Sequence, residues 1–178
     1  MSHATKEFVP LNIAVLTVSD TRSLAEDSSG QLLQDRLTEA GHQLLERVII
    51  PDDIYRLRAE VSRWIADTQV QVVLVTGGTG FTDRDSTPEA LLPLFDKQVE
   101  GFGELFRQIS FNEIGTSTVQ SRAVAGIANH TLVFCMPGST NACRTAWDNI
   151  VGEQLDSRTR PCNFVPHVTP QDRCESRG

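Results

Sequence analysis

The chain has 178 residues, of which 39% are hydrophobic and 22% are charged, as in ordinary globular proteins. Its length favours one domain, and a formal net charge of −7 without a run of Lys or Arg argues against nucleic-acid binding. No basic region precedes a long apolar run and no C-x-x-C pair occurs, so we expect a cytoplasmic protein with free thiols and without a signal peptide or membrane span.

Strand-like and helix-like segments alternate along the chain. Apolar runs of five to eight residues predict buried strands, and longer stretches with apolar positions on one face predict helices. The helix starts carry capping residues and the first helix stops at a glycine. In chain order we expect a strand at 11–18, a helix capped by Ser28 or Ser29 and stopping at Gly41, a strand at 42–50, a helix within 51–68 capped by Asp52 or Asp53, a strand at 70–76, a helix capped by Thr87 with Pro88 at its first position, a helix at 101–115, a further helix within 116–127, a strand at 130–138 and a helix at 139–155.

This alternation predicts an α/β protein with a mostly parallel sheet. We expect a single domain over 8–164 and an irregular, polar tail over 165–178. Ligands of such sheets bind beyond the carboxyl ends of the strands. The turns after Val18, Ile50, Thr76 and Met136 are therefore the places to search for a site.

The stretch VTGGTGFTDRDSTPEA, Val75 to Ala90, resembles a dinucleotide-binding loop at first sight. In a G-x-x-G-x-x-G pattern, Gly77 and Gly80 fit the first two places, but Asp83 stands in the third. A carboxylate there opposes a pyrophosphate, and the next helix begins only near Thr87. No G-x-x-x-x-G-K-[ST] motif occurs either, so we reject both nucleotide-fold interpretations.

The same stretch fits a phosphate site that also holds a cation. Thr76 to Gly80 offers backbone N–H groups that approach an anion closely, because glycine has no Cβ. Asp83 and Asp85 follow directly, and Asp52 lies at the end of another expected strand. Carboxylates beside a phosphate cradle suit Mg²⁺, which takes oxygen ligands from both.

Two further turns with small and hydroxyl residues lie at strand ends, in EDSSG (26–30) and MPGST (136–140). Simpler roles stay open for several of these residues. Asp52, Thr87 and Ser139 also suit helix caps, Asp27 also suits a turn, and Asp83 and Asp85 also suit solvated loop acids. The convergence of three such turns on one sheet edge favours a binding site.

Three stretches carry a resemblance to a known family: TVSDTRSLAEDSSG, TGGTGFTDRDSTPEAL and FCMPGSTNACRTAWDNI. Together they resemble the MoaB/MogA family of molybdenum cofactor biosynthesis proteins, over about Phe8 to Phe164. GTSTVQSRAVAGIANHTLVF and the RTRPCNF tail are most similar to the MoaB branch. The resemblance implies a molybdopterin-binding fold, a Rossmann-like three-layer α/β/α sandwich with a mixed sheet.

The resemblance also implies an activity. Active members bind molybdopterin, transfer AMP from Mg-ATP to its terminal phosphate and release pyrophosphate. Mg²⁺, ATP and molybdopterin are therefore the expected cofactor and ligands, and the chain itself is the expected partner, in a homotrimer or homohexamer. Other enzymes of molybdenum cofactor synthesis are further expected partners. A second hypothesis is a non-catalytic, oligomeric pterin-binding carrier or scaffold of the same pathway.

Residue by residue, the resemblance assigns catalysis and Mg²⁺ binding to Asp52 and Asp85, with Asp53 as the alternative to Asp52. The ionised substrate phosphate is the nucleophile, so no catalytic Ser, Cys or His is needed. The expected substrate-binding residues are Ser19, Asp27, Ser28, Gly30, Thr76, Gly77, Gly78, Thr79, Gly80, Glu104, Ser121, Arg122, Pro137, Gly138 and Ser139.

Overall fold

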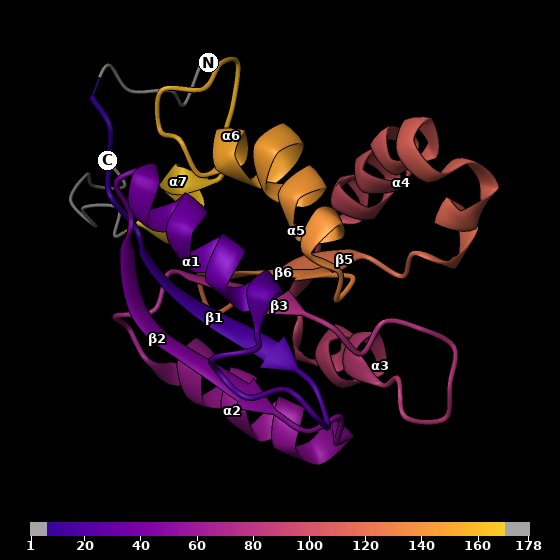
Figure 1. Cartoon of the computed structure of the whole chain (residues 1–178). Coiled ribbons are helices and arrows are strands. Elements are labelled where there is room, and N and C mark those ends of the chain that lie inside the picture. The colour runs from indigo at the N-terminus through magenta and orange to yellow at the C-terminus, as the bar shows by residue number, and fades with distance from the viewer. Residues whose placement is uncertain (1–6, 170–178) are drawn as a thin grey trace.

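A six-stranded mixed sheet forms the centre of the molecule (Figure 1). The computed structural model describes residues 7–169. The strand order is β2-β1-β3-β6-β5-β4; the first four strands of this order run parallel, and β5 is antiparallel to both its neighbours. The strands are β1 (Asn12–Val18), β2 (Gln43–Ile50), β3 (Val72–Thr76), β4 (Lys97–Gln98), β5 (Val124–Ala128) and β6 (Thr131–Met136).

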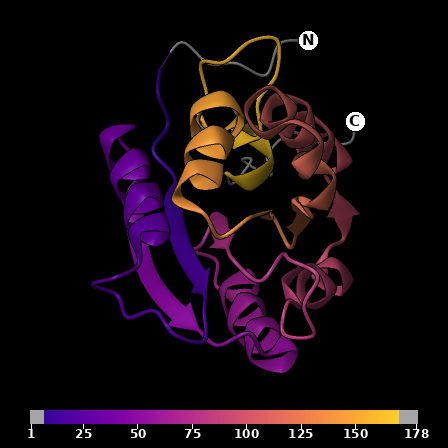
Figure 2. The same ribbon diagram turned by 45° about the vertical axis from the view of Figure 1, so that its right-hand side comes forward.

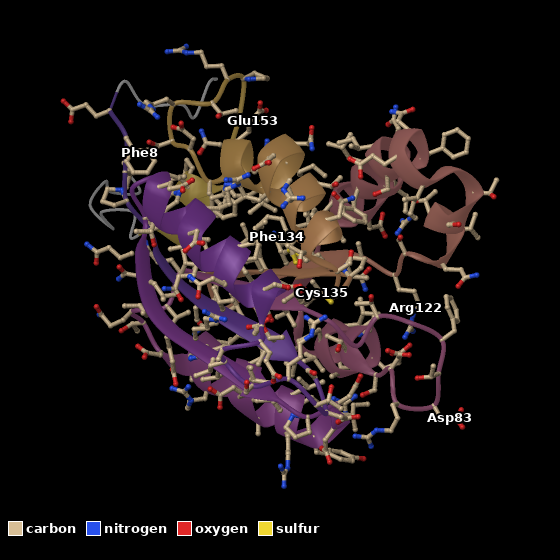
Figure 3. The ribbon with its side chains drawn as sticks, in the orientation of Figure 1. Phe8, Asp83, Arg122, Phe134, Cys135 and Glu153 are labelled. Atoms are coloured by element: carbon tan, nitrogen blue, oxygen red, sulfur yellow. The ribbon has the colours of Figure 1, made fainter. Side chains whose placement is uncertain are left out.

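The three central strands β1, β3 and β6 are buried on both faces because helices cover the sheet from either side. Successive side chains point to opposite faces. Phe134 belongs to the hydrophobic cluster on one face, and Cys135 to the cluster on the other (Figure 3). These strands form the rigid frame whose carboxyl ends carry the turns of interest.

Helices pack on both faces of the sheet, as Figures 1 and 2 show. The first cluster includes apolar side chains of α1, α4, α5 and α7, and the second those of α2 and α3. This arrangement confirms the predicted α/β sandwich with a mostly parallel, mixed sheet. The helices are α1 (Ser28–Glu39), α2 (Ile54–Ala66), α3 (Thr87–Leu91), α4 (Glu100–Ile114), α5 (Thr140–Ala146), α6 (Gly152–Gln154) and α7 (Val165–Val168), with 3-10 turns at Leu92–Leu94 and Gly115–Gln120 and a π turn at Trp147–Val151.

The predicted helix within 116–127 is wrong. Gly115–Gln120 forms a 3-10 helix, and Val124–Ala128 forms β5, which pairs with β6. Asn129 and His130 have φ values of 47° and 65° and make the two-residue turn between these strands. Two consecutive positive φ values are typical of a tight hairpin turn, and this pairing overrides the weak helical pattern.

Several predicted boundaries also need correction. Asp27, not Ser28 or Ser29, caps α1, because its carboxylate accepts a 2.9 Å bond from the Gly30 N–H. Ser86 precedes α3, so Thr87 is its first residue rather than its cap.

The predicted irregular tail is wrong for residues 165–168, which form α7. Val165 and Val168 are buried in the core, so their apolar side chains hold this turn of helix against the sheet. The remaining tail residues 170–178, with Cys174, lie outside the described residues.

Cys135, Cys143 and Cys162 are free thiols, as predicted. None of the helices described over 7–169 is long and apolar enough to cross a membrane.

Candidate functional site

A cavity of about 460 Å³ lies at the carboxyl ends of β1, β3 and β6. The turn after β1, the glycine turn after β3 and the turn after β6 form its walls, as the position of ligands in parallel sheets predicts. Its lining residues are Thr17, Val18, Ser19, Thr21, Arg22, Thr76, Gly77, Gly78, Thr79, Gly80, Asp85, Gly138 and Ser139.

The glycine turn has a backbone that other residues adopt only with strain. Gly77 and Gly78 have φ values of 100° and 64°. A Cβ on Gly77 would lie 2.4 Å from the Val18 carbonyl oxygen, and one on Gly78 would lie 2.1 Å from Thr87 Oγ1 and 2.5 Å from Asp52 Oδ2. The glycines therefore let the backbone pass directly over Asp52.

Asp52 is a buried carboxylate, with an exposed fraction of 7%, at the turn between β2 and α2. Its Oδ1 accepts a 3.1 Å bond from the Ser86 N–H and a 2.7 Å bond from the Ser86 hydroxyl. No Lys or Arg among residues 7–169 forms an ion pair with it. Burial raises the pKa of Asp52, the Ser86 bonds lower it, and the carboxylates of Asp85 and Asp20 raise it again.

The Thr87 hydroxyl adds an unsatisfied oxygen beside this carboxylate. Thr87 is fully buried, and its Oγ1 has no hydrogen-bond partner in the described part of the chain. Buried hydroxyls are normally paired. Asp52 and Thr87 therefore form a polar spot beneath the glycine turn that the protein itself leaves incomplete.

Asp85 lies at the cavity wall. Its Oδ2 accepts bonds from the Thr82 N–H at 2.9 Å and the Thr82 hydroxyl at 2.6 Å. These bonds hold the pKa of Asp85 below its usual value, and the Arg122 guanidinium lowers it further. Asp85 is thus held ionised beside Asp52.

The other acid predicted in this loop, Asp83, is exposed. Figure 3 shows its side chain at the outer tip of the loop, directed away from the molecule. The interpretation of Asp83 as a solvated loop acid therefore fits the structure.

A buried ion pair between Asp27 and Arg47 fixes the turn before α1. Asp27 is 1% exposed, and its Oδ2 accepts bonds from Arg47 Nη2 at 3.0 Å and from the Thr17 hydroxyl at 2.8 Å. A Cβ on Gly30 would lie 2.0 Å from the same oxygen. Asp27 and Gly30 therefore do not line the cavity but fix the turn that leads into it.

On the side of α1 and α5, hydroxyl groups and one cation gather around the Gly138 carbonyl. The Ser29 hydroxyl donates a 2.7 Å bond to it, and Arg22 Nη1 lies 3.4 Å away. Ser139 caps α5 through a 3.1 Å bond from the Ala142 N–H, as expected of a helix cap. Ser28 is linked to the Thr140 hydroxyl at 2.7 Å.

Glu104 and Arg122 line a different cavity, of about 400 Å³, between α4 and β5. Ser121 lies beside it, and its carbonyl accepts a 3.2 Å bond from Arg107 Nη1. The structure thus separates this predicted group from the glycine turn.

Arg122, labelled in Figure 3, nevertheless links this cavity to the glycine turn, because it lines the one and bonds to residues of the other. Its guanidinium donates to the carbonyls of Thr79 at 3.0 Å, Gly80 at 2.6 Å and Asp85 at 3.2 Å, and it pairs with Glu89. These contacts hold the loop that carries Asp85, so in this structure Arg122 is a clamp rather than a free ligand-binding group.

The structure therefore brings most predicted ligand residues to one cavity. Pro137 lies just behind it, where its carbonyl accepts a 3.0 Å bond from the Thr76 hydroxyl. Four residues of the site were not predicted from the sequence: Thr17, Thr21 and Arg22, which line the cavity, and Ser86, which binds Asp52. The position of Thr21 and Arg22 directly after a strand end was the available signal.

Asp52 and Asp85 are the carboxylates available to a cation here. Within residues 7–169, no group of three or more His, Cys, Asp or Glu side chains is arranged to hold a metal by itself. Mg²⁺ commonly binds through one or two carboxylates, with phosphate oxygens and water completing its coordination. The donor set fits a cation that arrives with a phosphate ligand.

Comparison with known proteins identifies the family. A family model described as a probable molybdopterin binding domain matches residues 14–157. The chain belongs to the MoaB/MogA family of molybdopterin-binding proteins.

Individual relatives of the MoaB branch agree with this assignment. The chain is 62% identical over 168 residues to molybdenum cofactor biosynthesis protein B of Escherichia coli K12, with 94% of this chain and 99% of that protein covered. It is 44% identical over 142 residues to the protein of the same name from Bacillus subtilis, with 79% and 84% covered. A crystal structure of a molybdenum cofactor biosynthesis protein B superimposes with a TM-score of 0.80 at 43% identity, with 83% and 92% covered.

These matches confirm the resemblance inferred from the three sequence stretches and the predicted molybdopterin-binding fold. The matched range, residues 14–157, includes Asp52, Asp85, the glycine turn and the turn after β6.

Proposed function

We propose that this MoaB/MogA-family protein binds molybdopterin and transfers AMP from ATP to the terminal phosphate of the pterin. The observation that carries the proposal is a pair of carboxylates at the glycine turn: Asp85 lines the cavity, and Asp52 lies buried beneath Gly78 without an ion-pair partner among the described residues. A buried carboxylate without such a partner destabilises a fold, so its presence favours a ligand-binding role.

The proposed reaction needs positioning more than a reactive side chain. An oxygen of the pterin phosphate attacks the α-phosphorus of ATP, the bond from that phosphorus to the bridging oxygen breaks, and pyrophosphate leaves. The nucleophile is ionised before it binds. The backbone N–H groups of Gly78 and Thr79 hold phosphate oxygens in this proposal, because the glycines let a ligand approach the backbone closely, whereas the Gly77 N–H is already bonded to the Met136 carbonyl.

Asp52 and Asp85 hold Mg²⁺ in this proposal, and the unpartnered Thr87 hydroxyl is an additional buried oxygen beside them. Mg²⁺ held by these carboxylates would neutralise charge that develops on the triphosphate. Ser86 orients Asp52, and Thr82 orients Asp85, through the hydrogen bonds described above. The protein thereby fixes both carboxylates before the ligands arrive.

A non-catalytic pterin carrier or scaffold is the competing hypothesis. It needs the cavity and its phosphate-binding turns but has no need for two neighbouring carboxylates that repel bound phosphate. Both carboxylates lie against the glycine turn, Asp52 at Gly78 and Asp85 at Gly80, and this placement favours the transferase.

The decisive experiment is a transfer assay. The purified protein is incubated with molybdopterin, Mg²⁺ and ATP, and adenylylated pterin and pyrophosphate are measured. We expect product from the wild type and a loss of about 100-fold or more in Asp85→Asn, the size found when a group that stabilises transition-state charge is removed.

Asp83→Asn is the matched control, since Asp83 lies two residues away and is exposed. It should keep the wild-type rate. Pterin binding without product, while an active transferase works in the same mixture, would instead establish the carrier role. Equal rates in wild type and Asp85→Asn would refute the assignment of Asp85.

We also infer that the protein assembles with copies of itself. Leu105, Phe111 and Ile114 of α4 are 41%, 55% and 48% exposed, and Val119 beside them in sequence is 76% exposed. Large apolar side chains exposed along one segment are typical of protein interfaces. Light scattering should give a trimeric or hexameric mass, and Phe111→Glu with Ile114→Glu should lower it; a monomeric wild type would contradict the inference.

A further inference from the structure

The two ends of the 460 Å³ cavity lie over opposite faces of the sheet. Asp85, which lines the cavity, and Asp52, which lies buried beneath Gly78, belong to the side of α2 and α3, which pack on one face. Arg22 and Gly138, which line the cavity, and Ser29, which contacts both, belong to the side of α1 and α5, which pack on the other. The cavity therefore has an acidic end and a basic, hydroxyl-rich end.

Arg22 is the one cationic side chain among the residues that line this cavity. No carboxylate of residues 7–169 lies within ion-pair distance of it. Its contacts are 3.3 Å to the Ser29 hydroxyl and 3.4 Å to the Gly138 carbonyl, both at the long limit for hydrogen bonds. The guanidinium is thus at the cavity with most of its donors uncommitted.

Arg84, an arginine of the loop after β3, differs in this respect. Arg84 donates to both oxygens of Asp20, at 3.0 and 2.8 Å, so a carboxylate already occupies its fork of donors. Asp20 in turn accepts a 3.1 Å bond from the Asp52 N–H, at the acidic end. Arg22 alone of the two is available to an anionic ligand.

A backbone hydrogen bond fixes the main chain at Arg22. Its N–H donates a 3.1 Å bond to the Ser19 hydroxyl, within a turn that follows β1 directly. The main chain at Arg22 is therefore fixed to the strand end, while the side chain reaches across to the turn after β6. A short turn of this kind places a charge reproducibly even though the side chain is exposed.

We propose that Arg22 binds the terminal phosphate of molybdopterin and that ATP takes the acidic end of the same cavity. The proposal rests on the proposed function. A guanidinium binds a terminal phosphate by two parallel hydrogen bonds without a metal. A triphosphate carries more charge and binds with Mg²⁺, which requires the carboxylates at the opposite end.

The test compares ligands with and without the phosphate. Equilibrium binding of molybdopterin, of dephosphorylated molybdopterin and of Mg-ATP is measured separately for the wild type, Arg22→Gln, Arg22→Lys and Arg144→Gln. Arg144→Gln is the matched control, because Arg144 is an exposed arginine of α5 that does not line the cavity.

We expect Arg22→Gln to weaken binding of molybdopterin roughly tenfold, the size of a lost charge-assisted pair. Binding of the dephosphorylated pterin and of Mg-ATP should change by less than about twofold. Arg22→Lys should fall between the wild type and Arg22→Gln, since it keeps the charge but loses the paired donors. Arg144→Gln should bind all three ligands like the wild type.

Three results would overturn the proposal. The first is unchanged molybdopterin binding in Arg22→Gln, and the second is equal weakening of the phosphorylated and dephosphorylated pterin. The third is a loss confined to Mg-ATP, which would place the triphosphate at Arg22 instead. A wild type that binds no pterin in either form would refute the proposed function itself, and the role of Arg22 with it, whereas binding without transfer leaves the phosphate comparison decisive.

Discussion

Asp27 and Asp52 are two buried carboxylates at the same edge of the sheet, in opposite electrostatic situations. Asp27 pairs with Arg47 and also accepts bonds from the Thr17 hydroxyl and the Gly30 N–H. Asp52 accepts bonds from Ser86 alone among side chains, at one of its two oxygens.

The difference separates an acid that holds the fold from an acid kept for a ligand. Every polar atom of the Asp27 carboxylate is engaged by the protein, so its place is set by stability. Asp52 and the unpartnered Thr87 hydroxyl both lie against Gly78, and burial raises the pKa of the Asp52 carboxyl. Proteins keep such unsatisfied groups mainly where a function requires them.

The largest expected effect is on stability, from Asp27→Ala. Removal of one partner leaves Arg47 buried without its counter-charge, and such changes cost about 3–5 kcal/mol of the free energy of unfolding. Urea denaturation followed by circular dichroism measures the loss. Asp35→Ala, at an exposed position of the same helix, should cost far less; equal losses in the two variants would show that Asp27 is not held as described.

The second effect is on the reaction, from Asp52→Asn. We expect transfer of AMP to fall about 100-fold or more, because a neutral amide cannot hold the cation. Stability should stay equal or rise, since ionised Asp52 is disfavoured by burial and an amide oxygen still accepts the Ser86 bonds.

The rate of AMP transfer and the free energy of unfolding are both measured on Asp52→Asn, to decide whether Asp52 serves the reaction or the fold. A large loss of stability together with the loss of rate would make Asp52 a structural acid like Asp27. A normal rate with normal stability would remove it from the site.

The buried side chain of His42 makes the stability of the fold depend on pH, and this sets the pH range in which Asp27 and Asp52 can be compared. His42 is 5% exposed and packs beside Phe8, and its Nδ1 accepts a 3.1 Å bond from the Leu11 N–H. Burial lowers the pKa of His42 from 6.5 to about 4. The unfolded chain therefore binds a proton more readily than the folded chain, and stability is lost as pH falls from about 6.5 towards 4.

The loss attributable to His42 is on the order of 2–3 kcal/mol between these pH values. Unfolding curves at pH 7 and pH 4.5 measure it, with His42→Gln as the comparison. The variant should show a smaller drop between the two pH values. An identical drop would mean that His42 does not titrate as its burial requires, and the acids can then be compared at lower pH as well.

The sheet edge and most of the cavity could be predicted from the sequence, because each depends on local pattern. Continuous apolar runs in the sequence indicated β1, β3 and β6. The turn after β3 was recognisable because its backbone has positive φ at two positions, which favour glycine. Three such turns at strand ends meet by the geometry of a parallel sheet alone.

The different situations of Asp27 and Asp52 could not be predicted in this way. Both acids stand in turns before a helix and look alike in sequence. Asp27 differs because it pairs with Arg47, which lies twenty residues further along the chain on β2. Asp52 has no such ion-pair partner among the described residues. Strand β5 was missed for a similar reason, because its pairing with β6 and not its own composition determines its structure.

The smallest expected effect comes from Asp53→Asn, which tests the alternative assignment within the Asp-Asp pair. Asp53 caps α2, where its Oδ1 accepts bonds from the Tyr55 and Arg56 N–H groups at 3.0 and 2.9 Å, so its side chain is committed to the helix. Asparagine caps helices about as well as aspartate, and the stability and the transfer rate should both stay near those of the wild type. Asp52→Asn, one residue away, should lose the rate alone. A rate lost in Asp53→Asn and kept in Asp52→Asn would reverse the assignment, and would mean that a capping carboxylate leaves its helix to bind the cation.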